Sequence, residues 1–323
     1  MRQAGRYLPE YQKLRQKHTF VEMCTFPDLA VEVSLQPYRR FGFDAVIVFY
    51  DILFLAAAMG APLEFTDQGP VFRQPIRRRP EVESLRQPDL ESLEPAVGTG
   101  AILESLRRIR AEVPDGTSVL GFAGAPFTVA SYLVEGSFQR SGDRIKRLLH
   151  EDPELVHGLL EKLASVTGEY LAAQVAAGAD AVQLFDTWAG LLGAADFREF
   201  ALPYQKAVLD RVAQTGAPTI LYVKGGAHLL GELAKSGASV LSLDWRQSLP
   251  EVRRTLGAGI GLQGNLDPAS LFAPPETVKQ KVAALLDSMQ RDPGYILNLG
   301  HGILPETPLA SVEALVETVR NRE

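Results

Sequence analysis

The sequence predicts an α/β fold, a single (β/α)8 barrel of the TIM type with a hairpin insertion near residues 63–79. Short apolar runs alternate with helical segments along the chain, and several of these runs end in a polar side chain. No glycine-rich dinucleotide motif follows the first run, which disfavours an open doubly wound sheet. Because no linker divides the chain, we expect residues 1–323 to form one barrel domain.

Composition restricts the possible classes of function. With 323 residues, 46% of them hydrophobic, the chain can bury a large core. Its formal net charge of -6 argues against nucleic acid as a partner, because non-specific binding to nucleic acid needs a broad basic surface. No apolar run is long enough to span a membrane, and no secretory segment follows Met1. The single cysteine, Cys24, cannot form an internal disulfide, so we expect a cytoplasmic protein with no membrane partner.

Seven apolar runs are predicted to be buried parallel strands. Each run is short and is bounded by a glycine or a turn, and continuous apolar runs are typical of strands with both faces covered. We count the opening stretch near Arg2 as an eighth strand. The seven runs are Asp44–Phe49, Val119–Gly124, Ala181–Phe185, Thr219–Val223, Val240–Leu243, Ile260–Gln263 and Tyr295–Leu299.

Helical segments are predicted between these runs, with one exception. Pro9 suits the first turn of a helix, and Pro153–Ala177 carries the apolar stripe of a helix that packs on a sheet. Leu63–Arg79 instead resembles a hairpin that turns at Gly69-Pro70. The arginine run 77–79 at its end is interpreted either as a solvated hairpin edge or as a rim that attracts an anionic ligand.

Three segments share one frame: "RRFGFDAVIVFYD", "AAGADAVQLFDT" and "AKSGASVLSLDW". In each, a helix ends at a glycine, the chain turns, and an apolar run ends in an aspartate. The glycine is explained by the left-handed conformation that caps a helix. The aspartates need another explanation. The glycines are Gly42, Gly178 and Gly237, and the aspartates are Asp51, Asp186 and Asp244.

Polar side chains follow nearly every predicted strand, at the end where barrel enzymes have their active sites. Each has a structural alternative. Asp186 or Asp244 would also serve as a cap of the next helix, and Lys224 as the partner of a neighbouring aspartate. His301 would also fit as a hydrogen-bonded core histidine. The ring as a whole favours an active site, and it comprises Arg2, Arg6, Asp51, Gly124, Asp186, Thr187, Lys224, Asp244, Asn265 and His301.

Asp51 and the two opening arginines indicate the chemistry of the ligand. Asp51 follows the apolar run "AVIVFY", where a carboxylate is costly unless it meets hydrogen-bond donors. It suits a ligand that turns several N–H groups toward one point, or a developing cation. Arg2 and Arg6 suit carboxylates or phosphates, because a guanidinium binds planar oxyanions at two atoms. The combination indicates an amine-like centre with acidic arms.

Eight motifs, in this order, resemble the uroporphyrinogen decarboxylase family over essentially the whole chain: "MRQAGRYLPEY", "FYDIL", "GFAGAPFT", "YLVEG", "LFDTWAG", "LDW", "LQGNLDP" and "NLGHGILP". The resemblance implies a single (β/α)8 barrel, a homodimer, and no metal or organic cofactor. It implies removal of the carboxyl groups of the four acetate side chains of uroporphyrinogen III, giving coproporphyrinogen III and four CO2. In the family a first strand precedes the opening motif, so we expect Met1 to be an internal residue of the natural protein and that strand to be incomplete.

The resemblance also implies roles for residues at matching positions. Arg2 and Arg6 match the arginines that bind substrate carboxylates, with Gln3 between them, and Asp51 matches the aspartate that meets the pyrrole N–H groups. The implied catalytic residues are Asp51, Arg2, Tyr132 and His301, with Arg2 or His301 as proton donor. The implied substrate-binding residues are Arg2, Gln3, Arg6, Asp51, Tyr132, Phe185, Thr187 and His301. Tyr50 and Phe127 depart from the serine and tryptophan common in the family, so the pocket wall is expected to differ there.

The implied reaction explains why a carboxylate is needed at the position of Asp51. Loss of CO2 leaves an electron pair on carbon, and without a cofactor the substrate itself must accept it. Protonation of a pyrrole ring carbon produces an iminium-like cation, which a fixed carboxylate stabilises. Two alternatives stay open. Zinc-dependent methyltransferases with this barrel need histidine and cysteine ligands on late strands, where this chain has no cysteine. A tetrapyrrole-binding protein without turnover would keep the arginines.

Overall fold

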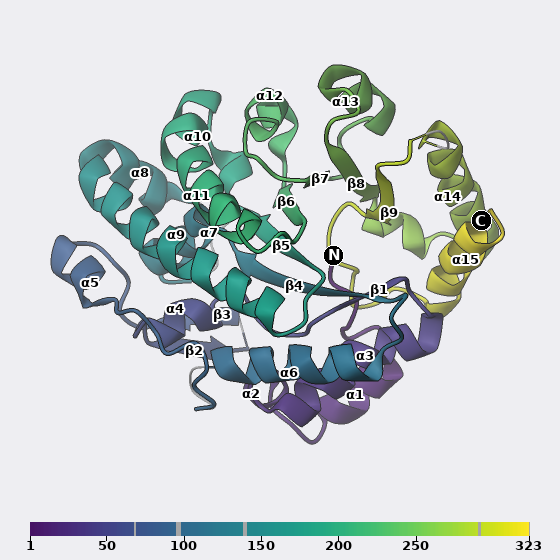
Figure 1. Ribbon diagram of the computed structural model, residues 1–323, viewed down its shortest axis with the longest axis horizontal. Coiled ribbons are helices and arrows are strands. Elements are labelled where there is room, and N and C mark those ends of the chain that lie inside the picture. The colour runs from purple at the N-terminus through teal and green to yellow at the C-terminus, as the bar shows by residue number, and fades with distance from the viewer. Residues whose placement is uncertain (68, 95–97, 138–140, 290–291, 323) are drawn as a thin grey trace.

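A curled parallel sheet runs through the centre of the computed structural model, which describes residues 1–67, 69–94, 98–137, 141–289 and 292–322 (Figure 1). Its seven strands follow one another in chain order, and each pairs in parallel with the next. The predicted TIM-type α/β fold is confirmed. The strands are β1 (Ala45–Ile47), β4 (Ser118–Gly124), β5 (Ala181–Asp186), β6 (Thr219–Val223), β7 (Val240–Ser242), β8 (Gly261–Leu266) and β9 (Tyr295–Leu299).

All seven predicted runs form strands, whereas the stretch near Arg2 does not. The opening residues have no regular structure, and the side chain of Gln3 takes the place of a strand beside β1. Its Nε2 donates to the carbonyl of Ala45 at 2.8 Å, and its Oε1 accepts from the N–H of Ile47 at 3.0 Å. Within the described residues no backbone pairing joins β9 to β1, and the N-terminal end of the chain lies in this seam (Figure 1).

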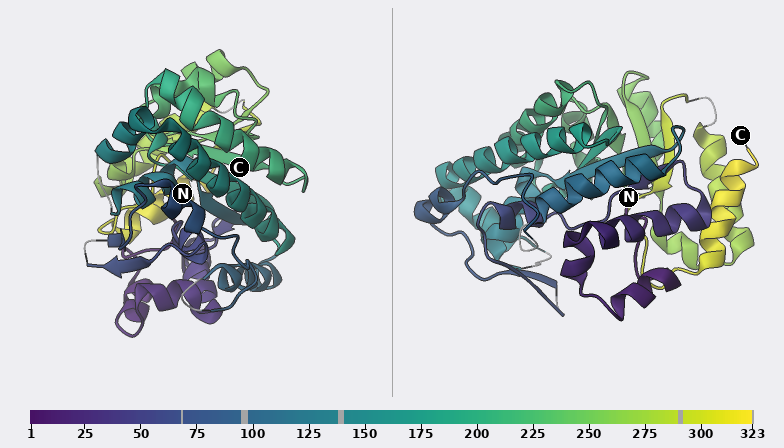
Figure 2. Two further views of the ribbon diagram at one scale, coloured as in Figure 1. Left: turned by 90° about the vertical axis from the view of Figure 1, so that its left-hand side faces the viewer. Right: turned by 60° about the horizontal axis from the view of Figure 1, so that its bottom comes forward.

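Helices form the outer layer around the sheet, as both views in Figure 2 show. The predicted long helix is α9, which begins at Pro153, with Asp152 accepting a hydrogen bond from the N–H of Leu155 at 3.1 Å. The helices are α1 (Pro9–Arg15), α2 (Phe20–Thr25), α3 (Pro27–Phe41), α4 (Phe54–Ala58), α5 (Arg79–Ser84), α6 (Thr99–Glu112), α7 (Pro126–Glu135), α8 (Asp143–Glu151), α9 (Pro153–Ala176), α10 (Ala194–Phe200), α11 (Leu202–Ala213), α12 (Leu230–Leu233), α13 (Leu249–Leu256), α14 (Pro275–Met289) and α15 (Leu309–Arg320). Short 3-10 turns are η1 (Ala189–Leu191), η2 (Gly226–Leu229) and η3 (Pro268–Phe272).

The predicted hairpin is present, and one of the three predicted glycine caps is. Gly42 caps α3 in the left-handed conformation (φ 63°). The prediction is wrong for the other two helices, because α9 and α12 are capped by Ala177 and Ala234. Gly178 and Gly237 have positive φ (110° and 83°) but lie beyond those caps, in the turns that lead to the next strands. The hairpin consists of β2 (Leu63–Thr66) and β3 (Gly69–Phe72). Thr66 lies opposite Gly69, so Gly69 and Pro70 begin β3 and the turn falls earlier than predicted. Residue 68, in that connection, lies outside the described residues.

The hydrophobic core lies between the sheet and the helices. Its centre contains the buried apolar residues of β4, β5 and β6 and the facing side of α9. A second cluster packs α1, α14 and α15 beside β8 and β9. Among the described residues, no helix combines the length and the apolar character needed to cross a membrane. The layers therefore hold the carboxyl ends of the strands, and the loops that follow them, at one edge of the sheet.

Candidate active site

Aromatic side chains mark the concave face of the sheet. The ring of Phe185 on β5 lies edge-on to that of Phe122 on β4 (5.5 Å between centroids, 89°) and to that of Tyr222 on β6 (5.9 Å, 68°). Tyr222 Oη donates to the carbonyl of Gly300, just after β9, at 2.9 Å. This bond crosses the space in front of β7 and β8, so these side chains face the inside of the curl.

Asp51 stands just beyond the carboxyl end of β1 and is half-buried. Its Oδ1 accepts from the N–H of Leu53 at 2.9 Å, and no other described residue is bonded to its carboxylate. Burial raises the pKa of Asp51, while the hydrogen bond from Leu53 and the positive charge of Arg2 act in the opposite direction. The carboxylate is therefore partly desolvated and keeps an acceptor oxygen for a ligand.

Arg2 and Arg6 are exposed, and neither guanidinium is paired with a described residue. Arg2 packs against Gly302 of the "GHG" motif, where an added Cβ would lie 3.3 Å from the Cβ of Arg2. Burial raises the pKa of Tyr11, and Arg15, Arg6 and Arg2 act against that increase, so both predicted arginines lie near this ring. Two free guanidinium groups at the barrel mouth suit a ligand with several oxyanions.

Gln3 has a structural task that the sequence does not indicate. Its amide is committed to the backbone of β1, and its own carbonyl accepts from Tyr7 Oη at 2.7 Å. Of the polar groups of Gln3, only the backbone N–H has no hydrogen-bond partner among the described residues. Substrate binding by Gln3 therefore stays a prediction, and the backbone N–H, not the side chain, is the group that could take part.

His301 lies against Tyr222. The two rings stack with 5.8 Å between centroids at 14°, and Tyr222 Oη is 3.1 Å from His301 Nδ1. Burial, together with the positive charges of Lys224, Arg2 and the N-terminus and against an opposing effect of Asp244, lowers the pKa of His301 to about 4. The imidazole is therefore neutral at pH 7, and it lies within the field of these cations.

Tyr132 and Thr187 complete the set of predicted residues. The ring of Tyr132, on α7, meets the ring of Trp188 edge-on at 5.6 Å and 74°. Burial raises the pKa of Tyr132 to about 12, with a further contribution from the charge of Asp51, so its hydroxyl keeps its proton. Thr187 and Lys224 directly follow Asp186 and Val223, the last paired residues of β5 and β6. The charge of Arg2 therefore acts on both Asp51 and His301, and the charge of Asp51 acts on Tyr132.

Asp186, unlike Asp51, is fully buried and engaged. Thr128 Oγ1 donates to its Oδ1 at 2.7 Å, and Gln205 Nε2 donates to its Oδ2 at 2.7 Å. Burial raises the pKa of Asp186 to about 6, although both of these hydrogen bonds lower it. This aspartate fastens α7 and α11 to the end of β5, so it is part of the scaffold beneath Thr187.

Asp244 is the second scaffold aspartate. It is fully buried and accepts from the N–H of Gly225 at 2.5 Å, from the N–H of Arg246 at 3.0 Å and from Arg246 Nη1 at 2.7 Å. The bond to Gly225 ties the loop after β6 to the loop after β7. Asp244 is therefore the partner of Arg246, and the predicted alternative in which Lys224 pairs with a neighbouring aspartate does not occur among the described residues.

The two departures from the family pattern are both buried. Tyr50 stacks on Phe122 at 4.2 Å, donates from Oη to the carbonyl of Phe122, and accepts from Gln174 Nε2 at 3.2 Å. Phe127 is 2% exposed and belongs to the core. Tyr50 therefore closes the wall behind Asp51. The sequence did not identify Tyr222 as a site residue. The one feature that could have pointed to it is its hydroxyl group, which is unusual within a largely apolar strand.

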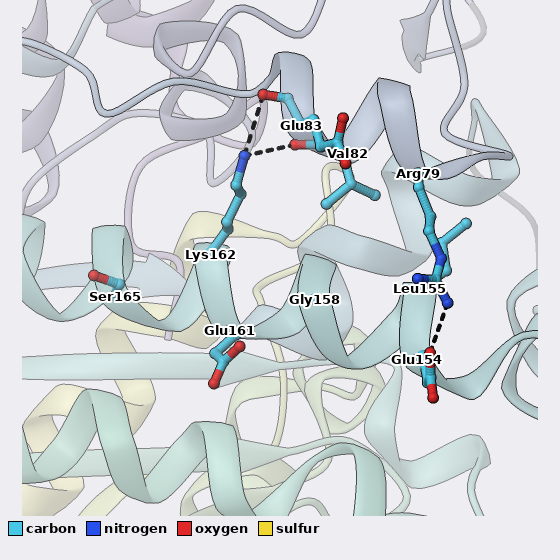
Figure 3. A pocket seen from close by; sticks show the side chains of 9 residues that line it. All are labelled: Arg79, Val82, Glu83, Glu154, Leu155, Gly158, Glu161, Lys162 and Ser165. Carbon is cyan, nitrogen blue, oxygen red and sulfur yellow. Dashed lines mark hydrogen bonds and ion pairs between the residues drawn. The ribbon is translucent and has the colours of Figure 1, made fainter.

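A groove between α5 and α9, shown in Figure 3, is lined by none of these residues. There Lys162 donates to the carbonyls of Val82 and Glu83 at 2.9 and 3.3 Å, and Arg79 pairs with Glu154 at 2.7 Å. These contacts dock α5 on α9. Arg79 therefore belongs to a solvated edge that is held by an ion pair. For this residue, the structure favours the first of the two interpretations of the arginine run.

The residues that the structure describes contain no group of three or more His, Cys, Asp or Glu side chains placed to hold a metal ion. Cys24 is fully buried on α2, and burial together with the charge of Asp51 raises the pKa of its thiol. A zinc site of the methyltransferase type has no ligand set in this part of the chain.

Comparisons with known proteins extend these observations. The family model for uroporphyrinogen decarboxylase (URO-D) matches residues 1–322. The chain is 45% identical over 320 residues to uroporphyrinogen decarboxylase of Carboxydothermus hydrogenoformans, covering 99% of this chain and 90% of the relative. It is 43% identical over 320 residues to that of Pelobacter propionicus, covering 99% and 92%.

Among solved structures, a methyltransferase from Methanosarcina mazei superimposes with a TM-score of 0.84 at 24% identity, covering 99% of this chain and 93% of that one. A B12-independent methionine synthase from Shewanella sp. gives 0.59 at 14% identity, covering 92% and 88%. At such identities the likeness concerns the fold alone. The full-length family match and the 43–45% identities place the chain in the uroporphyrinogen decarboxylase family.

Proposed function

We propose that this protein removes the carboxyl groups of the four acetate side chains of uroporphyrinogen III, giving coproporphyrinogen III and four CO2 in haem biosynthesis. Family membership supplies the substrate class. The observation that carries the proposal is Asp51, a half-buried carboxylate with an oxygen left for a ligand, at the barrel mouth beside Arg2. Tyr132 and His301 border the same space.

Substrate binding in this proposal depends on local charge. Uroporphyrinogen carries eight carboxylates, which a protein of net charge -6 repels overall. Arg2 and Arg6 present unpaired guanidinium groups that bind carboxylates in a bidentate manner. They hold the acidic arms while the pyrrole N–H groups turn toward the carboxylate of Asp51.

The chemical step needs an acid and a stabilising anion. A proton added to the pyrrole ring carbon makes the ring an iminium-like cation, and the electrons of the breaking carbon–carboxylate bond flow into it as CO2 leaves. A second proton then adds to the exocyclic methylene carbon to form the methyl group, and the ring carbon gives up the first proton to restore the pyrrole. Asp51 stabilises the cation as it forms. A preorganised group of this kind is typically worth roughly 10²–10³ in rate.

Arg2 and His301 remain the two candidate proton donors, each with a condition. The imidazole of His301 is neutral in the free protein. It becomes a cation that can serve as an acid only after substrate carboxylates offset the positive charges that lower its pKa. Arg2 is always protonated but is a poor acid. Tyr132, with a pKa near 12, contributes a hydroxyl that donates a hydrogen bond.

We further propose that residues 1–323 act as one domain, in the cytoplasm, as a homodimer. The buried lone cysteine supports a reducing compartment. Light scattering of the purified protein tests the dimer.

The direct test incubates the protein with anaerobically prepared uroporphyrinogen III and resolves the products by chromatography. Successive appearance of species with seven, six, five and four carboxyl groups is the expected result. Binding of the tetrapyrrole without any of these products would overturn the proposal in favour of a carrier. Bound zinc in the purified protein, together with no conversion of uroporphyrinogen, would favour the methyltransferase alternative.

A further inference from the structure

Lys224 is a cation at the site without a partner. It is half-buried at the end of β6, and it forms no ion pair or hydrogen bond with any described residue. The nearby aspartate of the shared frame, Asp244, is already saturated by Gly225 and Arg246. Because no described carboxylate engages this ammonium, it is free to bind an anionic group of a ligand.

Lys224 directly follows β6, which ends at Val223. Side chains alternate along a strand, and continuing this alternation by one residue turns Lys224 toward the same face as Tyr222. Tyr222 faces the inside of the curl, because its hydroxyl reaches Gly300 and its ring stacks on His301. Lys224 therefore stands one layer above Tyr222, toward the mouth. The influence of Lys224 on the pKa of His301, which is larger than that of Arg2, agrees with this placement.

The backbone around Lys224 is held firmly. The N–H of the next residue, Gly225, bonds to the buried carboxylate of Asp244 at 2.5 Å. On the other side, the carbonyl of Lys224 packs so closely against Gly190 that an added Cβ there would lie within 1.9 Å of it. The backbone that carries the Lys224 side chain is thus held by the scaffold on both sides, as a binding residue requires.

We propose that Lys224 is a third contact for the carboxylates of the substrate, on the wall formed by Thr187 and His301, in addition to Arg2 and Arg6. The inference rests on the proposed function and adds to it a named contact for one acidic arm. Arg2 and Arg6 come from the opening segment, whereas Lys224 comes from the carboxyl end of β6. The macrocycle would therefore be held by cations from two parts of the barrel mouth.

The test compares Lys224→Gln with Lys281→Gln, an exposed lysine on α14 that makes the same change in net charge. A hydrogen bond between charged groups is worth about ten- to a hundred-fold in binding. Lys224→Gln is expected to raise KM for uroporphyrinogen III by about this factor with a much smaller change in kcat. Lys224→Arg, which retains a cation, is expected to recover most of the loss, and Lys281→Gln is expected to behave as the wild type.

A second measurement keeps binding separate from turnover. Quenching of uroporphyrin III fluorescence, with this oxidised and unreactive macrocycle as the probe, reports Kd, and the Kd of Lys224→Gln is expected to rise in parallel with KM. Circular dichroism establishes that each variant is folded. If the wild type binds the porphyrin but does not decarboxylate uroporphyrinogen, the proposed function fails while the quenching comparison still tests Lys224.

Two results would overturn the inference. One is a KM and a Kd for Lys224→Gln that match those of Lys281→Gln. The other is a loss confined to kcat together with a displaced acid limb of the pH profile, because Lys224 would then act through His301 and not on the substrate.

Discussion

Replacement of Asp51 by asparagine tests separately how the buried carboxylate affects stability and how it affects catalysis. The amide keeps the size of the side chain, and its Oδ1 can still accept from the N–H of Leu53. Burial raises the pKa of Asp51, so the charged form is the less favourable one in the folded protein. Removing the charge should therefore leave the free energy of unfolding unchanged or increase it.

The expected loss of activity follows from the charge. A carboxylate and a cation about 4 Å apart interact by about 4 kcal/mol at an effective dielectric constant near 20. That energy corresponds to roughly 10³ in rate. Mutational losses of single preorganised groups, roughly 10²–10³, fall in the same range. Asp51→Asn should consequently lose about two to three orders of magnitude in kcat.

The assay is anaerobic conversion of uroporphyrinogen III, with the carboxylated intermediates resolved by chromatography, combined with thermal melting of each variant. Asp115→Asn, an exposed aspartate before β4, makes the same change in charge and is the matched control. Turnover of Asp51→Asn within a few-fold of the control would refute the role of the carboxylate. So would a loss of turnover that merely follows a loss of fold.

Four further outcomes are expected. Arg6→Ala should raise KM because its guanidinium is free for an acidic arm, and a fall in kcat at constant KM would place Arg6 at the chemistry instead. Asp186 has a pKa near 6 in the folded protein, above its usual 3.8. Between about pH 4 and 6 the folded protein therefore binds a proton that the unfolded chain does not. As the pH rises through this range, the free energy of unfolding falls by up to about 3 kcal/mol. The difference in stability between Asp186→Asn and the wild type should therefore favour the variant more at pH 7 than at pH 4. An equal difference in denaturation midpoint at the two pH values would contradict this. His301 ionises near pH 4, so kcat/KM should show no acid limb near 6.5, and a limb there that His301→Gln abolishes would be evidence against the lowered pKa. Dialysis against EDTA should leave turnover unchanged, because no described group of ligands could hold a metal ion, and a loss that zinc restores would contradict this.

The sheet could be predicted because its strands carry their own signal. A run such as Thr219–Val223 is apolar throughout, and all five residues are buried. The opening stretch has no such run: arginine, glutamine and glycine surround Ala4, so nothing local favours a strand, and the side chain of Gln3 satisfies the edge of β1 instead. The position of the hairpin turn was also misplaced, because Gly69 and Pro70 are turn formers that here begin a strand.

The site could be predicted only in part, because one residue type serves two purposes. Asp51, Asp186 and Asp244 end the same repeated frame, yet two of them hold the scaffold together. The groups that engage Asp186 come from Thr128 and Gln205, which are distant in the chain and carry no pattern of their own. Only the fold decides which aspartate keeps a free oxygen.

The amide of Gln3 links the segment that carries Arg2 to the strand that leads to Asp51. Its two hydrogen bonds, to the carbonyl of Ala45 and from the N–H of Ile47, align this segment with β1. A change at Gln3 would therefore alter the spacing between the guanidinium of Arg2 and the carboxylate of Asp51, although its side chain is committed to the backbone and reaches no ligand.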